Sequence, residues 1–269
     1  MSAKIGFIGA GRMAEAMMRG LIAADAYSEN DIIACAPSVS TRERIAADLG
    51  VKMYETAAEI AKNADIVVIA VKPEQVRELF EVEKLTFGPE HLVISIAAGI
   101  RISTLEAHVP DSRILRVMPN HCCMVSEGAS GFSRGARATD DDVKLAENML
   151  SSMGTAIEVA EEELDAVTGV SGSSPAFMYL FAEAIAEAGK RYGLPYDIGI
   201  ELAARSMIGA GRMILETGRT PRDLIDGVCT PGDATIEGIK ALGENDLKKA
   251  IQEAVDAVVK RTRSMSAGP

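Results

Sequence analysis

The chain has 269 residues, a length that fits one large domain or two smaller ones. Its formal net charge of −11 argues against a nucleic-acid partner, because a phosphate backbone requires a basic face. Hydrophobic residues make up 48% of the chain but aromatic residues only 4%, so its core must consist mainly of Ala, Val, Ile, Leu and Met.

The first half alternates short apolar runs with helical patterns, the arrangement that a parallel sheet with crossover helices requires. Strands are predicted at 4–8, 31–35, 66–71, 92–96, 114–118, 128–133 and 156–159. Helices are predicted between them, among others at 12–24, 41–49 and 140–153. The pattern indicates an α/β Rossmann domain with a doubly wound, mostly parallel sheet over residues 1–160.

Strand signals stop after about residue 160. Helices are predicted at 164–169, 175–192, 195–217, 221–226, 234–242 and 246–264. The helix at 175–192 is apolar over most of its circumference, so it should be buried on several sides, in part by a second subunit. Residues 161–269 are therefore predicted to form an all-α C-terminal dimerisation domain.

A dinucleotide fingerprint follows the first strand directly. In the run Gly9-Ala10-Gly11-Arg12-Met13-Ala14, Gly9 allows a tight turn and Gly11 lets the backbone approach a pyrophosphate. A tight turn without a ligand is the alternative, but the position between a strand and a helix favours a cofactor. The predicted contacts here are Ile8, Gly9, Ala10, Gly11, Arg12 and Met13.

The end of the second strand bears on the choice between NAD and NADP. An NAD site usually has an acidic residue there, whereas this chain continues with Ala36, Pro37 and Ser38 and then Thr41, Arg42 and Arg44. Hydroxyl groups and arginines favour the 2′-phosphate of NADPH, although NAD stays possible and either arginine could be an ordinary solvated helix residue. Ala36, Ser38 and Arg42 are the predicted contacts.

The four cysteines form no CxxC pair and have no spacing that suggests zinc, so no metal site is expected. The first residues do not resemble a signal peptide, and no apolar run is long enough to span a bilayer. We therefore expect reduced thiols and a cytoplasmic location.

Several further strings follow one another along the chain. They are AVKP (70–73), SIAAG (95–99), RVMPN (116–120), DAVTGVSGSSPAF (165–177), GLP (193–195) and CTPGDATIEG (229–238). In this order and spacing, they resemble the pyrroline-5-carboxylate reductase family. The resemblance implies reduction of the cyclic imine 1-pyrroline-5-carboxylate to L-proline, the last step of proline biosynthesis. It also implies a homodimer, which in some relatives assembles further.

The resemblance assigns residues to both ligands. On the cofactor side it implies Ala70, Val71, Lys72, Pro73, Ala97, Ala98 and Gly99. On the substrate side it implies Glu161 and the loop Thr230, Pro231, Gly232, Asp233, Ala234 and Thr235, within the C-terminal domain. Thr235 is the candidate catalytic residue, as a hydroxyl partner for the imine nitrogen. A Pro-Gly turn that opens a helix also presents free N–H groups, which suit a substrate carboxylate.

The chain departs from the family pattern at several positions. Relatives usually have Gly where this chain has Asp233 and Ser174, and Thr-Pro where it has His121-Cys122-Cys123. An Asn expected near Ala57 is also missing. Asp233 could cap the following helix or repel a substrate carboxylate.

Two alternative functions follow from these departures. One is a related imine or keto-acid reductase. Within it, the β-hydroxyacid dehydrogenases are disfavoured, because residues 175–188 lack the lysine that they carry on the long interdomain helix. The other is a dinucleotide-binding protein without catalytic activity.

Overall fold

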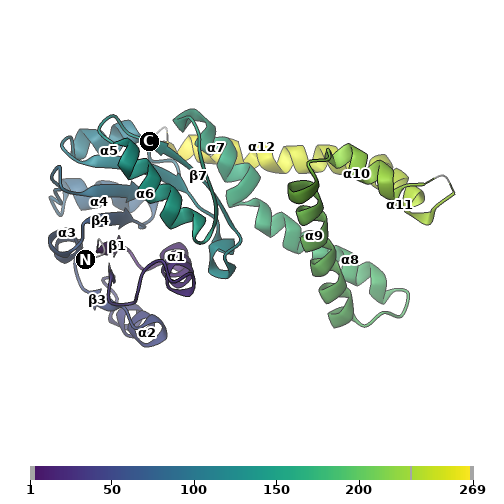
Figure 1. Cartoon of the computed structure of the whole chain (residues 1–269), viewed down its shortest axis with the longest axis horizontal. Coiled ribbons are helices and arrows are strands. Elements are labelled where there is room, and N and C mark those ends of the chain that lie inside the picture. Colours follow the sequence, from purple (N-terminus) through teal and green to yellow (C-terminus); the bar gives the residue numbers. More distant parts are fainter. Residues whose placement is uncertain (1–3, 231, 267–269) are drawn as a thin grey trace. The chain divides into compact units, whose positions relative to one another are not determined.

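The computed structural model describes residues 4–230 and 232–266 of the chain. Two compact units are present (Figure 1). The first contains the chain up to Ser173 and again from Asp256 onward, and the second runs from Ser174 to Val255.

The first unit contains one sheet in the order β3-β2-β1-β4-β5-β6-β7-β8. Its strands are β1 (Ile5–Ile8), β2 (Ile32–Cys35), β3 (Lys52–Tyr54), β4 (Ile66–Ile69), β5 (Leu92–Ser95), β6 (Arg113–Met118), β7 (Gly128–Arg134) and β8 (Gly154–Glu158). Neighbouring strands are parallel except β6 and β7. The predicted doubly wound, mostly parallel sheet is confirmed.

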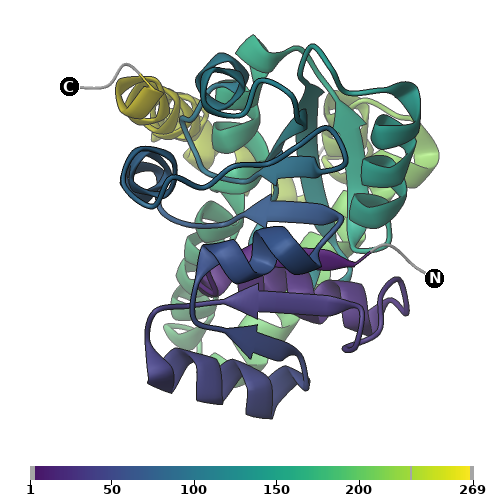
Figure 2. The same cartoon turned by 90° about the vertical axis from the view of Figure 1, so that its left-hand side faces the viewer.

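Helices lie on both faces of this sheet (Figure 2). One apolar cluster includes α1 (Arg12–Ala23), α2 (Val39–Leu49) and α6 (Asp140–Ser151). The other includes α3 (Ala57–Asn63), α4 (Pro73–Glu81) and α5 (Ile102–His108). Phe7 belongs to the first cluster and Ile8 to the second, as expected where successive side chains of a strand point to opposite faces.

Helix α3 packs unusually close to the central strand. A Cβ at Gly6 would lie 2.5 Å from Ile60 Cγ2 and 2.7 Å from Ala64 Cβ. Gly6 therefore sets how near this helix lies to β1, beside the turn where the strand ends.

The remaining helices follow β8. They are α7 (Leu164–Val167), a π-helical turn (Thr168–Gly172), α8 (Ser174–Lys190), α9 (Tyr196–Thr217), α10 (Pro221–Val228), α11 (Ala234–Glu244) and α12 (Leu247–Ser266). All the strands of the described chain lie before residue 160, as the sequence predicts. None of the described helices is long and apolar enough to cross a membrane.

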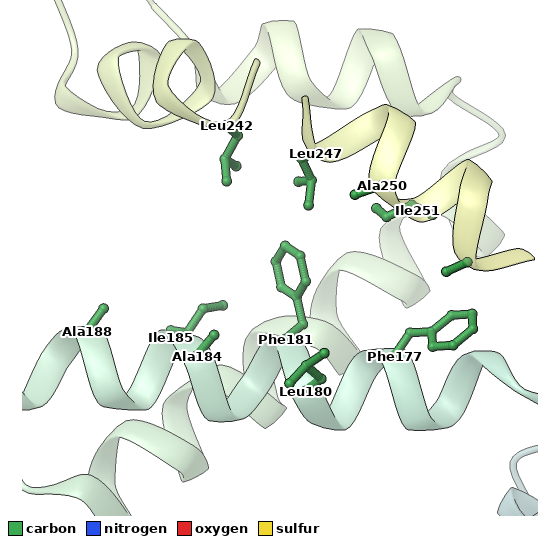
Figure 3. A pocket seen from close by; sticks show the side chains of 11 residues that line it. Phe177, Leu180, Phe181, Ala184, Ile185, Ala188, Leu242, Leu247, Ala250 and Ile251 are labelled. Carbon is green, nitrogen blue, oxygen red and sulfur yellow. The ribbon is translucent and has the colours of Figure 1, made fainter. Parts of the chain in front are cut away.

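Helix α8 is less buried within the single chain than its sequence predicts. Its buried residues are Pro175 and Ala186, whereas Tyr179 and Leu180 are 56% and 66% exposed. It lines an apolar groove of about 530 Å³, across which Phe181 points toward Leu242 and Leu247 (Figure 3). One copy of the chain therefore does not cover the apolar surface of its own α8.

Candidate functional site

Four parallel strands end together at one edge of the sheet. Ile8, the last residue of β1, is paired with Cys35 of β2 and Ile69 of β4, and Ile69 is paired with Ser95 of β5. Three predicted cofactor segments start directly after these strands, at Gly9, Ala36 and Ala70, and the 97–99 turn follows one residue beyond β5. The structure thus brings the fingerprint, the β2 end, the AVKP string and the AAG turn to one crevice edge, where doubly wound sheets bind ligands.

The glycine-rich turn has the backbone that a dinucleotide needs. Gly9 has a φ of +97°, and a Cβ there would lie 2.9 Å from the carbonyl oxygen of Ala70. Gly11 precedes α1, and a Cβ there would have no heavy atom within 4 Å. A side chain at Gly11 would therefore extend into open space beside the N-terminus of α1, the position that the sequence predicts for a pyrophosphate.

A pocket of about 440 Å³ adjoins this turn. Its walls include three of the predicted cofactor residues, Ile8, Gly9 and Val71. Ala57, the position near which the family pattern has an Asn, also lines the pocket. The other lining residues, which sequence reasoning did not assign to the cofactor, are Cys35, Pro37, Glu55, Thr56, Gln75, Glu78, Leu79 and Glu83. Burial raises the pKa of the Cys35 thiol to about 11, so no thiolate faces the pocket at neutral pH.

Part of this wall was missed because β3 was not predicted. This strand has only three residues, none of them fully buried, so it lacks an apolar run. A usable signal was the capping box at Thr56, whose hydroxyl and amide both donate to Glu59. That signal marks the start of α3 and hence the edge of the pocket.

The Arg42 side chain donates hydrogen bonds to the backbone of the loop that follows β2. Its Nη1 donates to the carbonyl oxygens of Ala36 at 2.7 Å and Pro37 at 2.9 Å, while Nη2 lies 3.9 Å from Glu55 Oε2. Ser38 caps α2 by accepting a hydrogen bond from the Thr41 amide. The Arg42 guanidinium therefore shapes this loop and still has donors on Nε and Nη2.

Arg44 is engaged elsewhere. Its Nη1 lies 2.9 Å from Glu15 and 3.5 Å from Asp48. Burial acts to raise the pKa of Glu15, but the hydrogen bonds from Arg19 and Arg44 lower it overall. Arg44 is thus held by carboxylates on α1 and α2.

The other predicted cofactor residues occupy helix starts and turns. Arg12 and Met13 begin α1 after Ala10 and Gly11. Lys72 is the N-cap of α4, its amide donates to Gln75 Oε1, and its side chain is exposed. In the turn after β5, the Ala97 amide donates to Ser95 Oγ and Gly99 has a φ of +79°.

Asn120 stabilises the segment after β6. Its Oδ1 accepts from the amides of Cys122 and Ala129, and its Nδ2 donates to the carbonyl oxygen of Ser171. The unusual residues His121 to Cys123 form part of a short 3-10 helix (His121–Val125), in which burial raises the pKa of the Cys123 thiol to about 11. The departure from the family pattern here lies in a turn that Asn120 stabilises.

Glu161 has two defined partners in the first unit. Its Oε1 accepts from the Ile102 amide at 2.7 Å and from Arg116 Nη1 at 3.1 Å. The sequence interpretation connected this carboxylate with a substrate and did not single out Arg116, which is buried on β6. The available signal was the position of Arg116, a charged residue of the RVMPN string inside the apolar run at 114–118.

The predicted substrate loop lies in the second unit at the start of α11. Gly232 has a φ of +89°, and Asp233 Oδ1 accepts from the Thr235 amide at 3.2 Å and from its hydroxyl at 3.4 Å. Asp233 is therefore the N-cap of α11. Pro231 lies outside the described residues.

Thr235 also lines an apolar pocket of about 580 Å³ between α9, α10 and α11. Most of its lining residues are hydrophobic, such as Met213, Ile225 and Ile239, and Arg219 contributes a cation. The loop thus combines a capped helix start with a threonine hydroxyl at the edge of an apolar cavity.

Two family models match the chain. The model for pyrroline-5-carboxylate reductase dimerisation matches residues 161–265, and the model for NADP oxidoreductase, coenzyme F420-dependent, matches residues 4–99. The chain is 40% identical to a pyrroline-5-carboxylate reductase of Methanosarcina acetivorans over 97% of each chain. It is 36% identical to one of Arabidopsis thaliana, over 98% of this chain and 96% of that protein.

Solved structures give the same result. A Plasmodium falciparum pyrroline carboxylate reductase with NADP bound has a TM-score of 0.88 at 28% identity, covering 98% of each chain. A pyrroline-5-carboxylate reductase from Coxiella burnetii has a TM-score of 0.86 at 33% identity, covering 99% of each chain. The resemblance found in the sequence motifs is confirmed over the whole length of the chain.

The open space at Gly11 gives a direct test of the dinucleotide site. Gly11→Val should fold normally, because its φ of −75° is ordinary and no atom obstructs its Cβ, yet its side chain should exclude a pyrophosphate. We expect titration to show an NADPH affinity at least about 100-fold weaker, roughly 2.8 kcal/mol. Unchanged affinity in a variant with an unchanged melting temperature would refute this assignment.

Proposed function

Because the chain belongs to the pyrroline-5-carboxylate reductase family, we propose that it reduces 1-pyrroline-5-carboxylate to L-proline with a hydride from NADPH. The observation that carries this proposal is the family match in both units. The left-handed glycine turn at Gly9, which is typical of dinucleotide-binding folds, supports it. The proposed division assigns residues 1–160 to the cofactor and 161–269 to the substrate and the dimer contact. The test is proline formation by the purified protein from pyrroline-5-carboxylate and NADPH.

The proposed reaction requires little acid–base catalysis by the protein. A protonated imine already accepts a hydride, so the chain has to hold the reactants and exclude water. The turn at Gly9 and Gly11 is proposed to hold the pyrophosphate, together with Ile8, Ala10, Arg12 and Met13. The segments 70–73 and 97–99 are proposed to border the remainder of the cofactor.

On the substrate side, the proposal assigns the loop 230–235 to the substrate carboxylate and Thr235 to the imine nitrogen. Free N–H groups at the start of α11 suit an anion, because the helix dipole is positive there. Asp233 already uses the Thr235 amide, so the substrate carboxylate must compete with it. The Thr235 hydroxyl, at the edge of an apolar pocket, supplies a polar partner for the nitrogen.

The protein is proposed to act in the cytoplasm. Its four cysteines are all free thiols, which supports a reducing compartment.

NADPH is the proposed preferred cofactor. Ala36 and Pro37 follow β2 without a carboxylate, while Arg42 and the Ser38 cap lie at the same loop. The relative from Plasmodium falciparum has NADP bound, which supports the proposal. Glu55 lies on the pocket wall 3.9 Å from Arg42, so a 2′-phosphate would compete with this carboxylate for the guanidinium.

We predict that kcat/KM is higher with NADPH than with NADH, and that Arg42→Met removes most of the difference. Loss of a charged hydrogen bond to the 2′-phosphate should lower kcat/KM with NADPH about tenfold, roughly 1.4 kcal/mol. The kcat/KM of Arg42→Met with NADH shows whether the substitution has damaged the loop itself. Arg44→Met is the matched control, because the Arg44 guanidinium binds Glu15 and Asp48. A clear NADH preference of the wild type would contradict the prediction.

A homodimer is proposed as the minimal unit. The dimerisation model matches 161–265, and the apolar groove along α8 lacks a cover within one chain. Light scattering should give at least twice the chain mass at micromolar concentration. Leu180→Glu should yield monomers, since it would bury an unpaired charge, whereas Val82→Glu, at the exposed residue that follows α4, should not. A wild type that is a stable monomer would contradict the proposal.

The catalytic assignment is tested at Thr235. Thr235→Ala should lower kcat/KM for the imine by roughly 5- to 150-fold, about 1–3 kcal/mol, with unchanged NADPH affinity, because it removes one hydrogen bond at the reacting nitrogen.

Asp233→Gly should cost only a few tenths of a kcal/mol in stability and should lower the KM for the imine, because it frees the Thr235 amide. A raised KM in Asp233→Gly would contradict the competition, and full activity of Thr235→Ala would contradict the role of its hydroxyl.

A further inference from the structure

A network of buried charges lies behind the turn at 97–99. Arg116 is on β6, where it is paired with Ser95 of β5, two residues before Ala97. Its side chain is 3% exposed, and its strand neighbour on the same face, Ile114, belongs to the cluster of α3, α4 and α5. A guanidinium therefore lies inside the sheet–helix layer, beside the strand that leads into this turn.

One carboxylate oxygen joins this strand to the next helix. Glu161 Oε1 accepts from Arg116 Nη1 at 3.1 Å and from the Ile102 amide at 2.7 Å. Ile102 is the first residue of α5 and follows Gly99 by three positions. The 97–99 turn is consequently fixed at both ends, by β5 next to Arg116 and by the start of α5 bonded to Glu161.

A second carboxylate holds the other side of the guanidinium. Asp165 Oδ1 lies 3.6 Å from Arg116 Nη2, and both atoms are buried without a hydrogen-bond partner among the described residues. Asp165 Oδ2 lies 3.6 Å from Nε of Arg263 in α12. Two cations and two carboxylates thus form a neutral group whose contacts all lie within the first unit.

Such a group is a poor source of stability. Removing charges from water costs several kcal/mol per ion in general, and apolar side chains of similar volume are often as stable. What the group supplies is a defined position, since a planar guanidinium contacts both carboxylates in a fixed geometry. The feature that it positions is the start of α5 and, with it, the turn before that helix.

We propose that Arg116, with Glu161 as its partner, is a positioning residue that sets the 97–99 turn at the distance that hydride transfer requires. The inference rests on the proposed function, in which this turn borders the cofactor. It gives Glu161 a role toward the Ile102 amide in place of a contact with substrate. A lysine ammonium is a single point charge without the planar fork that contacts the two carboxylates through Nη1 and Nη2, so Arg116→Lys should preserve the charge but not the position.

The first experiment compares Arg116→Lys with Arg113→Lys. Arg113 is the matched control, since it is the first residue of the same strand and binds a different buried carboxylate, Asp142 Oδ1 at 2.5 Å. We expect Arg116→Lys to lower kcat roughly 10- to 100-fold with an unchanged KM for the imine. Its primary isotope effect with 4-deuterated NADPH should increase, because hydride transfer becomes slower, and Arg113→Lys should leave both values unchanged.

The second experiment separates the two roles of Glu161. Glu161→Gln keeps an oxygen that can accept from the Ile102 amide, so it should retain most of the activity, whereas Glu161→Ala should lose as much as Arg116→Lys. Hydrogen exchange of the Ile102 amide, measured without ligands, should be faster in Glu161→Ala and unchanged in Glu161→Gln. A contact with substrate predicts instead that both variants raise the KM for the imine.

The outcomes keep this inference apart from the proposed function. A wild type that binds NADPH but does not form proline would refute the function, while the exchange measurement would still test the link to Ile102. An active wild type in which Arg116→Lys and Arg113→Lys behave alike would overturn the positioning role. So would a raised KM for the imine in Glu161→Gln, or unchanged exchange in Glu161→Ala.

Discussion

The register of the central parallel strands is the constraint on which the cofactor crevice depends. Ile8 of β1 is paired with both Cys35 and Ile69, so the chain leaves the sheet at neighbouring points on one edge. The turn at Gly9 can then lie against the Ala70 carbonyl only because it has no side chain. A shift of one residue in the register of β1 would also place Phe7 and Ile8 on the wrong faces of the sheet. The two apolar clusters therefore fix the register of β1 and, with it, the position of the crevice.

The helical unit is governed by a different constraint. A single helix layer cannot cover a helix that is apolar on most of its surface, and α8 leaves Tyr179 and Leu180 largely exposed in one chain. The groove between α8 and the start of α12 has the same apolar character. Association and folding of this unit are therefore expected to be coupled, since the apolar surface gains its stabilisation only when a second copy covers it.

Most of the fold could be predicted from the sequence because its elements have strong periodic patterns. The apolar runs of β1, β2 and β4 and the glycine turn at 9–11 are local signals, and the family strings supplied the segments that are proposed to contact the two ligands. β3 could not be predicted in this way, because Lys52, Met53 and Tyr54 have no alternating or continuous apolar pattern. It is a strand because it pairs with β2, and that pairing is a tertiary effect.

The side-chain partners of the site were beyond sequence reasoning for the same physical reason. A basic residue after β2 suggests a phosphate, but the pattern cannot show that Arg42 donates to Ala36 and Pro37 or that Arg44 is held by Glu15. Arg116 is the extreme case. Inside an apolar strand it is easily taken as part of a motif, yet its environment consists of carboxylates from distant parts of the chain, Glu161 and Asp165. A buried charge is costly unless its partners are in place, so this group of charges forms only where the fold brings these distant segments together.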